Sequence, residues 1–116
     1  PIFDLGFTAL LDDLEQRGLL ESTLVLAMGE FGRSPEISGI GGREHWPFGY
    51  SVVVAGGRTP GGSVIGSTTA DGGYPADRPI HPADLITTVI EKMGLNRLDL
   101  FARDSAVLGT SIEELS

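Results

Sequence analysis

The sequence predicts an α/β fold in which a mostly parallel sheet lies between flanking helices. Two short apolar runs, at residues 24–28 and 50–55, neither alternate nor reach helical length. Such runs are typical of strands that are buried on both faces of a parallel sheet. Two stretches with helical apolar spacing, at residues 3–14 and 82–93, bracket these runs. Loops rich in glycine and proline separate the elements, so we expect a layered α/β arrangement.

Proline and glycine delimit the two expected helices. The apolar face of the first helix is formed by Phe3, Phe7, Leu10, Leu11 and Leu14. Gly18 is placed to end this helix, and Gly94 is placed to end the second. Pro82 suits the first turn of the second helix. A short edge strand is expected at residues 63–66, and residues 111–114 match a capping box for a last helical turn.

Composition excludes several classes of partner and site. The 116 residues suffice for one domain with one core. A formal net charge of −8 argues against DNA or RNA as a partner, because phosphate backbones demand clustered cations. The absence of cysteine excludes a disulfide scaffold, a zinc–thiolate site and a cysteine nucleophile. No apolar run approaches the roughly 20 residues that span a bilayer, so we expect no membrane span.

Two strands alone cannot hide both of their faces, so the expected sheet is incomplete. The first residue is Pro1 rather than Met, which is consistent with a fragment. We therefore expect residues 1–116 to be a single C-terminal fragment of a larger domain. The missing strands would come from the N-terminal part of that domain or from another copy, because an uncovered sheet edge favours self-association.

The first candidate site follows the first strand directly. Parallel sheets bind ligands beyond the carboxyl ends of their strands, and Glu30 and Arg33 fall at that position. Gly29 and Gly32 allow the backbone to turn sharply and to approach a ligand closely. A carboxylate and an arginine within four residues can bind a metal ion and an anion side by side. The alternative is a Glu30–Arg33 ion pair on a surface loop.

A second candidate site contains Glu44 and His45. A carboxylate next to an imidazole supplies two ligands of mixed type, which are compatible with zinc or another divalent ion. The two neighbours can bind one ion only where the backbone is bent, and otherwise they can serve two ions. The alternative is that His45 packs on Trp46 with its ring nitrogens hydrogen-bonded. His81, before the second helix, is either a third ligand or a helix-flanking residue.

Three separated motifs carry a resemblance to a known family. The segments LLDDLEQRGLLESTLVLAMGEFGRSPEI, GGREHWP and SVVVAGG, the last followed by GGSVIGSTTADGGYPADRPIHPADLITTVIEKMGL, occur in this order. They resemble the end of proteins in the domain-of-unknown-function family 1501, which are large bacterial proteins that are often exported. These proteins are similar to the alkaline phosphatase/sulfatase superfamily. The resemblance implies a partial alkaline phosphatase-like sheet with flanking helices, and an exported or periplasmic location.

The resemblance also implies roles for individual residues. It makes Glu30 a metal-ligand carboxylate at a strand end, and it makes Glu44 and His45 a metal-binding pair. The residue before this histidine is normally Asp, so the resemblance is weaker at Glu44 than at His45. The nucleophile of the superfamily lies in the N-terminal half, which is not in this chain. Ser34 has no G-x-S-x-G elbow around it and does not replace that nucleophile.

Two functions are therefore expected as alternatives. The first is the C-terminal part of a metal-dependent hydrolase of phosphate or sulfate esters, inactive alone. In it Glu30, Glu44 and His45 would hold a divalent ion such as zinc, calcium or manganese, and Arg33 would neutralise the anion. The second is a non-catalytic binding or structural domain of an exported bacterial protein, because a fold does not fix a function.

Overall fold

The structure, a computed structural model, describes residues 1–96 and 109–116. Its helices are α1 (Ile2–Gln16), η1 (Leu20–Ser22), α2 (Pro82–Lys92) and η3 (Glu113–Leu115), of which η1 and η3 are short 3-10 helices. Its strands are β1 (Leu24–Ala27), β2 (Gly32–Arg33), β3 (His45–Trp46), β4 (Val53–Gly56), β5 (Ser67–Thr68) and β6 (Pro75–Asp77). Both expected helices and both expected apolar strands are present. Within the described residues, no helix is both long enough and apolar enough to cross a membrane.

Two local expectations are wrong. Residues 63–66 form no strand; the short strand β5 begins only after Gly66, whose φ of 75° breaks the extended backbone there. Residues 111–114 do not form a capping box, although a helical turn follows as η3. The N-cap residue of η3 is Ile112, and no side chain caps it. The Ser111 hydroxyl instead bonds the carboxylate of Glu91 on α2.

The strands form three antiparallel pairs in the part of the chain that the structure describes: β1 with β4, β2 with β3, and β5 with β6. In the first pair, Val25 lies opposite Ala55 and Leu26 lies opposite Val54. An antiparallel edge strand is common in sheets that are otherwise parallel. The mostly parallel sheet therefore stays a prediction that concerns strands other than these.

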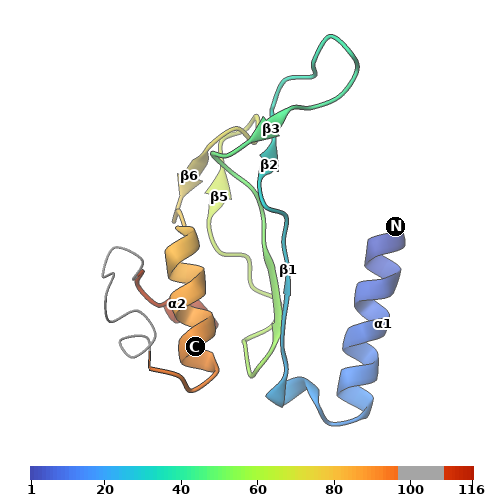
Figure 1. The fold of residues 1–116 in the computed structure, drawn as a ribbon, viewed down its shortest axis with the longest axis vertical. Coiled ribbons are helices and arrows are strands. Elements are labelled where there is room, and N and C mark those ends of the chain that lie inside the picture. Colours follow the sequence, from blue (N-terminus) through green and yellow to red (C-terminus); the bar gives the residue numbers. More distant parts are fainter. Residues whose placement is uncertain (97–108) are drawn as a thin grey trace.

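The pair β1–β4 lies between two helical layers. Figure 1 shows α2 and η3 on one side of these strands and α1 on the other. The core lies on the α2 side, where Leu85, Ile112 and Leu115 are buried and Val54 packs against them. Leu26 is the cross-strand partner of Val54 and therefore shares that face. The neighbouring pair, Val25 and Ala55, points toward the α1 side, because side chains alternate along a strand.

The α1 side is poorly covered. No residue of α1 is buried, and only Phe7, Leu11 and Leu14 are half-buried. No residue of β1 is fully buried either. The expectation that this strand is buried on both faces is therefore not met within the residues that the structure describes. The reason is geometric. Two strands about 5 Å apart form a sheet that is narrower than a helix with its side chains, which is about 10 Å wide, so neither element can cover the other fully.

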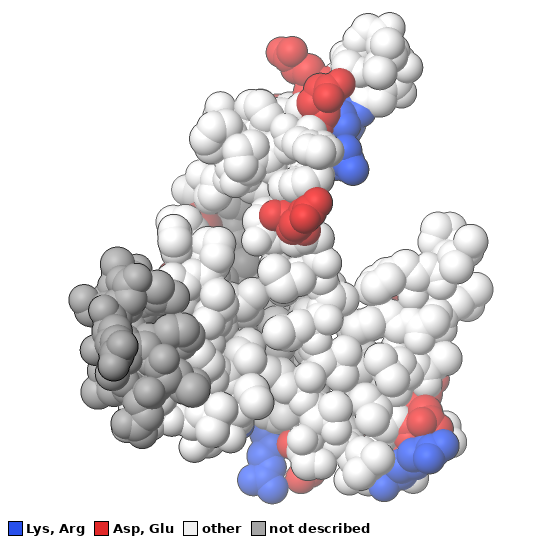
Figure 2. Space-filling view, in the orientation of Figure 1, with Lys and Arg blue, Asp and Glu red and all other residues white. Residues whose placement is uncertain are grey.

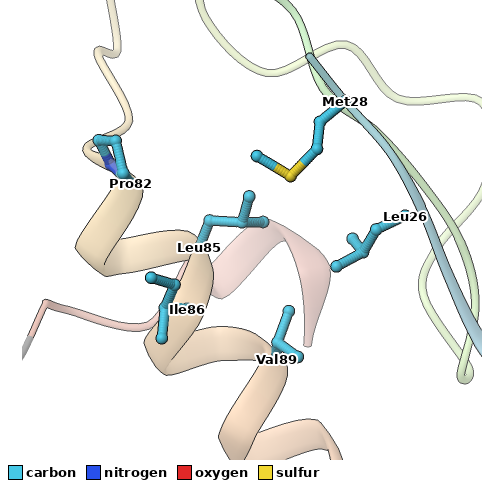
Figure 3. A pocket seen from close by; sticks show the side chains of 6 residues that line it. All are labelled: Leu26, Met28, Pro82, Leu85, Ile86 and Val89. Atoms are coloured by element: carbon cyan, nitrogen blue, oxygen red, sulfur yellow. The ribbon is translucent and has the colours of Figure 1, made fainter. Parts of the chain in front are cut away.

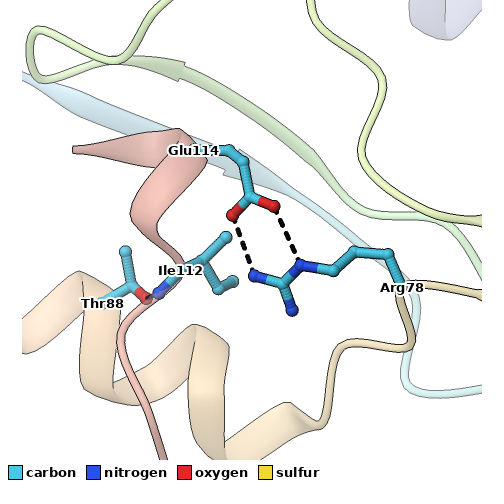
Figure 4. A network of polar contacts seen from close by, with 4 residues as sticks. All are labelled: Arg78, Thr88, Ile112 and Glu114. Carbon is cyan, nitrogen blue, oxygen red and sulfur yellow. Dashed lines mark hydrogen bonds and ion pairs between the residues drawn. The ribbon is translucent and has the colours of Figure 1, made fainter.

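The C-terminal residues are fastened to α2 by polar contacts. Figure 4 shows the Thr88 hydroxyl beside the Ile112 amide, which donates to it at 2.9 Å. The same figure shows Arg78 and Glu114 in a two-pronged ion pair, with both N–O distances at 2.8 Å. The tail residues thus complete the only face of the described sheet that has a buried core.

Candidate functional site

The residues singled out by the sequence lie on and beside the hairpin formed by β2 and β3. Its register pairs Gly32 with Trp46 and Arg33 with His45. The hairpin crosses the following loop closely at Gly32, where an added Cβ would fall 2.0 Å from the Gly49 carbonyl oxygen. No side chain fits there, so glycine is required at this position. The sequence analysis expected Gly32 to let the backbone approach a ligand closely. The close approach is present, but the neighbour is the backbone of Gly49 and not a ligand.

One face of the hairpin carries a cation and two stacked rings. The His45 ring stacks on Phe31 with centroids 3.8 Å apart, and the Arg33 guanidinium lies 5.4 Å from the centre of the same Phe31 ring. We call Phe31, Arg33 and His45 the cationic face. His45 therefore does not pack on Trp46, the alternative that the sequence left open. Arg33 and Glu30 form no ion pair among the described residues, and the Arg33 Nη1 donates to the Arg43 carbonyl at 3.2 Å.

Glu44 belongs to the opposite face of the hairpin. Its N–H donates to the Ser34 hydroxyl at 3.0 Å, and its carbonyl accepts from the Ser34 N–H at 3.0 Å. The second bond extends the backbone pairing of β2 with β3 by one residue, to Ser34 and Glu44, whereas the first ends on a side chain. Consecutive side chains along an extended strand point to opposite faces. Because Glu44 directly precedes His45 in this paired segment, we expect the two side chains to lie on opposite faces, which does not suit a single ion held by both.

A further cluster on the hairpin was missed as a unit by the sequence argument. Trp46, Phe48 and Tyr74 form three mutual ring contacts, with centroids 5.1 to 5.6 Å apart. The Trp46 indole N–H also donates to the Gly73 carbonyl. This cluster fixes the loop at residues 69–75 against β3. The signal in the sequence was three large aromatic residues in glycine-rich loops, where they belong to no helical or strand pattern of apolar residues.

That loop is also stabilised by its own carboxylate. The Thr69 hydroxyl donates to Asp71 at 2.6 Å, and the Gly73 N–H donates to Asp71 at 3.0 Å. These bonds, the Thr69 contact first, lower the pKa of Asp71 below its usual value. Asp71 is therefore held ionised as the acceptor of a tight turn, in the way that Asp commonly serves turns.

The remaining candidates are placed as follows. Glu30 lies in the bend between β1 and β2, and Glu30, Arg33, Glu44 and His45 are all exposed. His81 is the N-cap of α2, where its Nδ1 accepts from the Ala83 N–H at 3.3 Å and the Asp84 carboxylate accepts from the His81 N–H at 3.0 Å. This is the helix-flanking role. Among the residues that the structure describes, no three His, Asp or Glu side chains gather in a way that could hold a metal ion.

Comparison with known proteins gives one result. Residues 1–108 match the family described as "Protein of unknown function (DUF1501)". No match was found among curated proteins or among solved structures. The matched range includes β1, the whole β2–β3 hairpin and α2. Because the match covers nearly the entire chain, the protein belongs to the DUF1501 family.

Proposed function

We propose that this chain is part of a metal-dependent hydrolase of phosphate or sulfate esters, with the β2–β3 hairpin at its anion- and metal-binding mouth. The observation that carries the proposal is the register of the hairpin, which sets Arg33 directly across from His45. Side chains of such cross-strand partners share one face, with Cβ atoms about 5 Å apart. A permanent cation and a ring that can bind metal therefore stand side by side on the cationic face.

The imidazole of His45 and the carboxylate of Glu30 are suitable ligands for a divalent ion, but two ligands are fewer than such a site needs. Imidazole and carboxylate together suit zinc or manganese, and carboxylates alone suit calcium. Within the described residues, neither the His45 ring nor the Glu30 carboxylate has a hydrogen-bond partner, so both are free to act as ligands. Since the described residues hold no group of three such side chains, the proposed set needs a further ligand from outside the described ranges.

Each candidate site residue then has a defined role. His45 and Glu30 would hold the ion, and Glu44, on the opposite face of the hairpin, would serve a second ion or none. Arg33 keeps one N–H on the Arg43 carbonyl and has its other donors available for an ester oxygen. Phe31 supports both the guanidinium and the imidazole from one side. The metal, when bound, would polarise the ester oxygen and stabilise charge on the transferring group.

The test is metal binding by the chain itself, read by calorimetry with zinc, manganese and calcium. His45→Ala is expected to weaken zinc binding at least tenfold, and Glu30→Gln is expected to weaken it by a smaller factor. His81→Ala is the matched control, because it removes the only other histidine and touches only the cap of α2. Equal losses in His45→Ala and His81→Ala would contradict the proposal.

The second candidate function is a non-catalytic binding or structural domain. The observation that favours it is the lack of three gathered ligands among the described residues. It predicts a melting temperature that does not change when a chelator is added, and no measurable binding of any of the three metals. The hydrolase proposal predicts instead that zinc raises the melting temperature of the unmodified chain and not that of His45→Ala.

A further inference from the structure

Two arginines on the candidate-site hairpin have no carboxylate partner within the described residues. The other arginines that the structure describes each form an ion pair: Arg17 with Asp13, Arg58 with Glu21 and Arg78 with Glu114. Arg33 and Arg43 instead donate to backbone carbonyls. We call these two residues the arginine pair. Their positive charge is not neutralised locally, although the chain as a whole has a formal net charge of −8.

The two hollows of the described surface offer an anion less than the arginine pair does. Figure 3 shows the groove between β1 and α2, which measures about 180 Å³ and is lined by Leu26, Met28, Pro82, Leu85, Ile86 and Val89. None of these side chains is charged. The second hollow contains Arg58 and Lys92, but Arg58 lies 3.6 Å from the Glu21 carboxylate and the Lys92 Nζ donates to the Gly57 carbonyl at 3.2 Å.

Hydrogen bonds hold the arginine pair together at the base of the loop that joins β2 to β3. The Arg33 Nη1 donates to the carbonyl of Arg43 at 3.2 Å. The Arg43 Nη1 donates to the carbonyl of Ser34 at 2.7 Å and also to that of Pro35. Each guanidinium is therefore fixed against the backbone next to the other arginine. Like charges that are held close repel one another, and an anion bound by both would relieve that repulsion.

Ser34 fixes the backbone to which the arginine pair is bonded. It is only 8% exposed, and its hydroxyl accepts from the Glu44 N–H at 3.0 Å and donates to the Glu36 carbonyl at 2.8 Å. Its own N–H donates to the Glu44 carbonyl at 3.0 Å. The two strands of the hairpin are thus fastened to each other beside the arginine pair before any ligand arrives. Preorganised donors lose less conformational freedom on binding than mobile ones.

Both guanidinium groups keep donors for a ligand. Arg33 and Arg43 are exposed, and within the described residues only their Nη1 atoms form hydrogen bonds. Their Nε and Nη2 N–H groups form the planar fork that matches two oxygens of a phosphate or sulfate. Figure 2 shows positive and acidic side chains on the upper arm of the molecule. None of the described acidic side chains forms an ion pair with the arginine pair.

We infer that Arg33 and Arg43 together bind one tetrahedral oxyanion, the terminal phosphate or sulfate group of an ester, with its oxygens shared between the two guanidinium groups. The inference rests on the proposed function, which sets the charged end of an ester at Arg33. It adds Arg43, whose side chain has no role in that proposal. Because His45 lies directly across from Arg33, the bound group would lie beside the proposed metal ligand.

The experiment measures anion binding without metal. Methyl phosphate and methyl sulfate are titrated separately into the full chain in the presence of a chelator and followed by NMR, so that the two ester classes are distinguished. Arg33→Gln and Arg43→Gln are each expected to weaken binding about tenfold, whereas Arg43→Lys, which keeps the charge, stays within about threefold. Arg17→Gln is the matched control. It changes the net charge equally but on α1, and less than about a twofold effect is expected.

Glutamine at position 43 keeps a side-chain N–H that can donate to the Ser34 carbonyl. If Arg43 serves only to fasten the loop, Arg43→Gln will bind both esters as the unmodified chain does, and the inference is overturned. Equal losses in Arg17→Gln and Arg43→Gln would reveal a general charge effect and would also overturn it. The absence of anion binding by the unmodified chain would do the same.

A second measurement does not depend on whether the variants fold. On addition of the preferred ester to the unmodified chain, the Nε–H resonances of Arg33 and Arg43 should shift together, and that of Arg17 should stay in place. A shift of Arg33 alone would overturn the inference. The chelator separates this result from the metal site, so equal zinc binding by His45→Ala and the unmodified chain would contradict the proposed function and leave the anion titrations as measured.

Discussion

Helices α1 and α2 carry similar apolar stripes, yet only one of them buries its stripe. Helix α2 buries Leu85 and Ile90 and also two threonines, whereas α1 buries nothing. Both helices flank the same pair of strands, on opposite sides (Figure 1). The difference lies in the chain segment at residues 109–116, which returns to α2 and adds Ile112 and Leu115 to its core. A helix on a two-stranded sheet is thus covered only where a third element joins it.

The largest expected effect comes from removing the apolar anchor of the covered side. Ile112 is 2% exposed, and Ile112→Ala is expected to lower the free energy of unfolding by about 2–4 kcal/mol. Ile2 in α1 is 89% exposed, so Ile2→Ala is expected to cost less than about 0.5 kcal/mol. Urea denaturation followed by circular dichroism, at one fixed protein concentration, measures both. Similar losses in the two variants would show that α1 is as well covered as α2.

The next effect concerns the hairpin of the candidate site. Gly32→Ala forces a Cβ against the Gly49 carbonyl and is expected to cost about 2 kcal/mol by overpacking. Gly39→Ala is the control, because nothing lies within 4 Å of its Cβ position. Trp46, the only tryptophan, pairs with Gly32 and reports the change through its fluorescence. A shifted emission is expected for Gly32→Ala alone, and unchanged spectra for both would contradict the close crossing.

Several features of this fold could be predicted from the sequence because they depend on neighbouring residues. The helix at residues 82–92 was predicted from Pro82, from the apolar spacing and from Gly94, which ends it with a φ of 72°. The strand at residues 24–27 follows from its apolar run. The hydrolase hypothesis also assigned Arg33 and His45 to one site, and the register of the hairpin sets these two residues opposite one another.

The parts that could not be predicted depend on contacts between distant residues. The stacking of His45 on Phe31 follows from the register of β2 on β3, and nothing in the local pattern fixes that register. The bond between Ile112 and Thr88 joins residues 24 positions apart, so the capping box at residues 111–114 was the better local hypothesis and was still wrong. The parallel sheet remains a prediction for the same reason, because strands outside these residues would form it.

A matched pair of threonines isolates the contribution of the hydrogen bond between Thr88 and the Ile112 amide. Thr88 and Thr8 both donate to the carbonyl four residues earlier, at 2.7 and 2.8 Å, but only Thr88 also accepts from the buried Ile112 amide. Thr88→Val leaves that amide without its partner and is expected to cost about 1–2 kcal/mol. Thr8→Val is expected to change stability by less than about 0.5 kcal/mol. Amide exchange at Ile112 should accelerate only in Thr88→Val; if it does not, the tail is fastened by other contacts.

The smallest effect is a pH dependence at the same junction. The Thr110 N–H donates to Asp84 at 2.8 Å, and with the His81 N–H it lowers the pKa of Asp84 below its ordinary value of 3.8. A carboxylate whose pKa is lower in the folded state stabilises the fold above its unfolded pKa, and this contribution is lost as the pH falls through the folded value. The stability of the unmodified chain should therefore decline below about pH 4.

Asp84→Asn should flatten that decline, because the amide still accepts the Thr110 N–H but no longer titrates. Asp12→Asn on α1 is the control, because the Asp12 carboxylate makes no hydrogen bond or ion pair with the described residues. Urea midpoints measured between pH 5 and pH 2.5 give both slopes. If Asp84→Asn and the unmodified chain lose stability in parallel, the carboxylate that joins the tail to α2 is not the group that responds to acid, and the covered side owes its stability to the apolar contacts of Ile112 and Leu115.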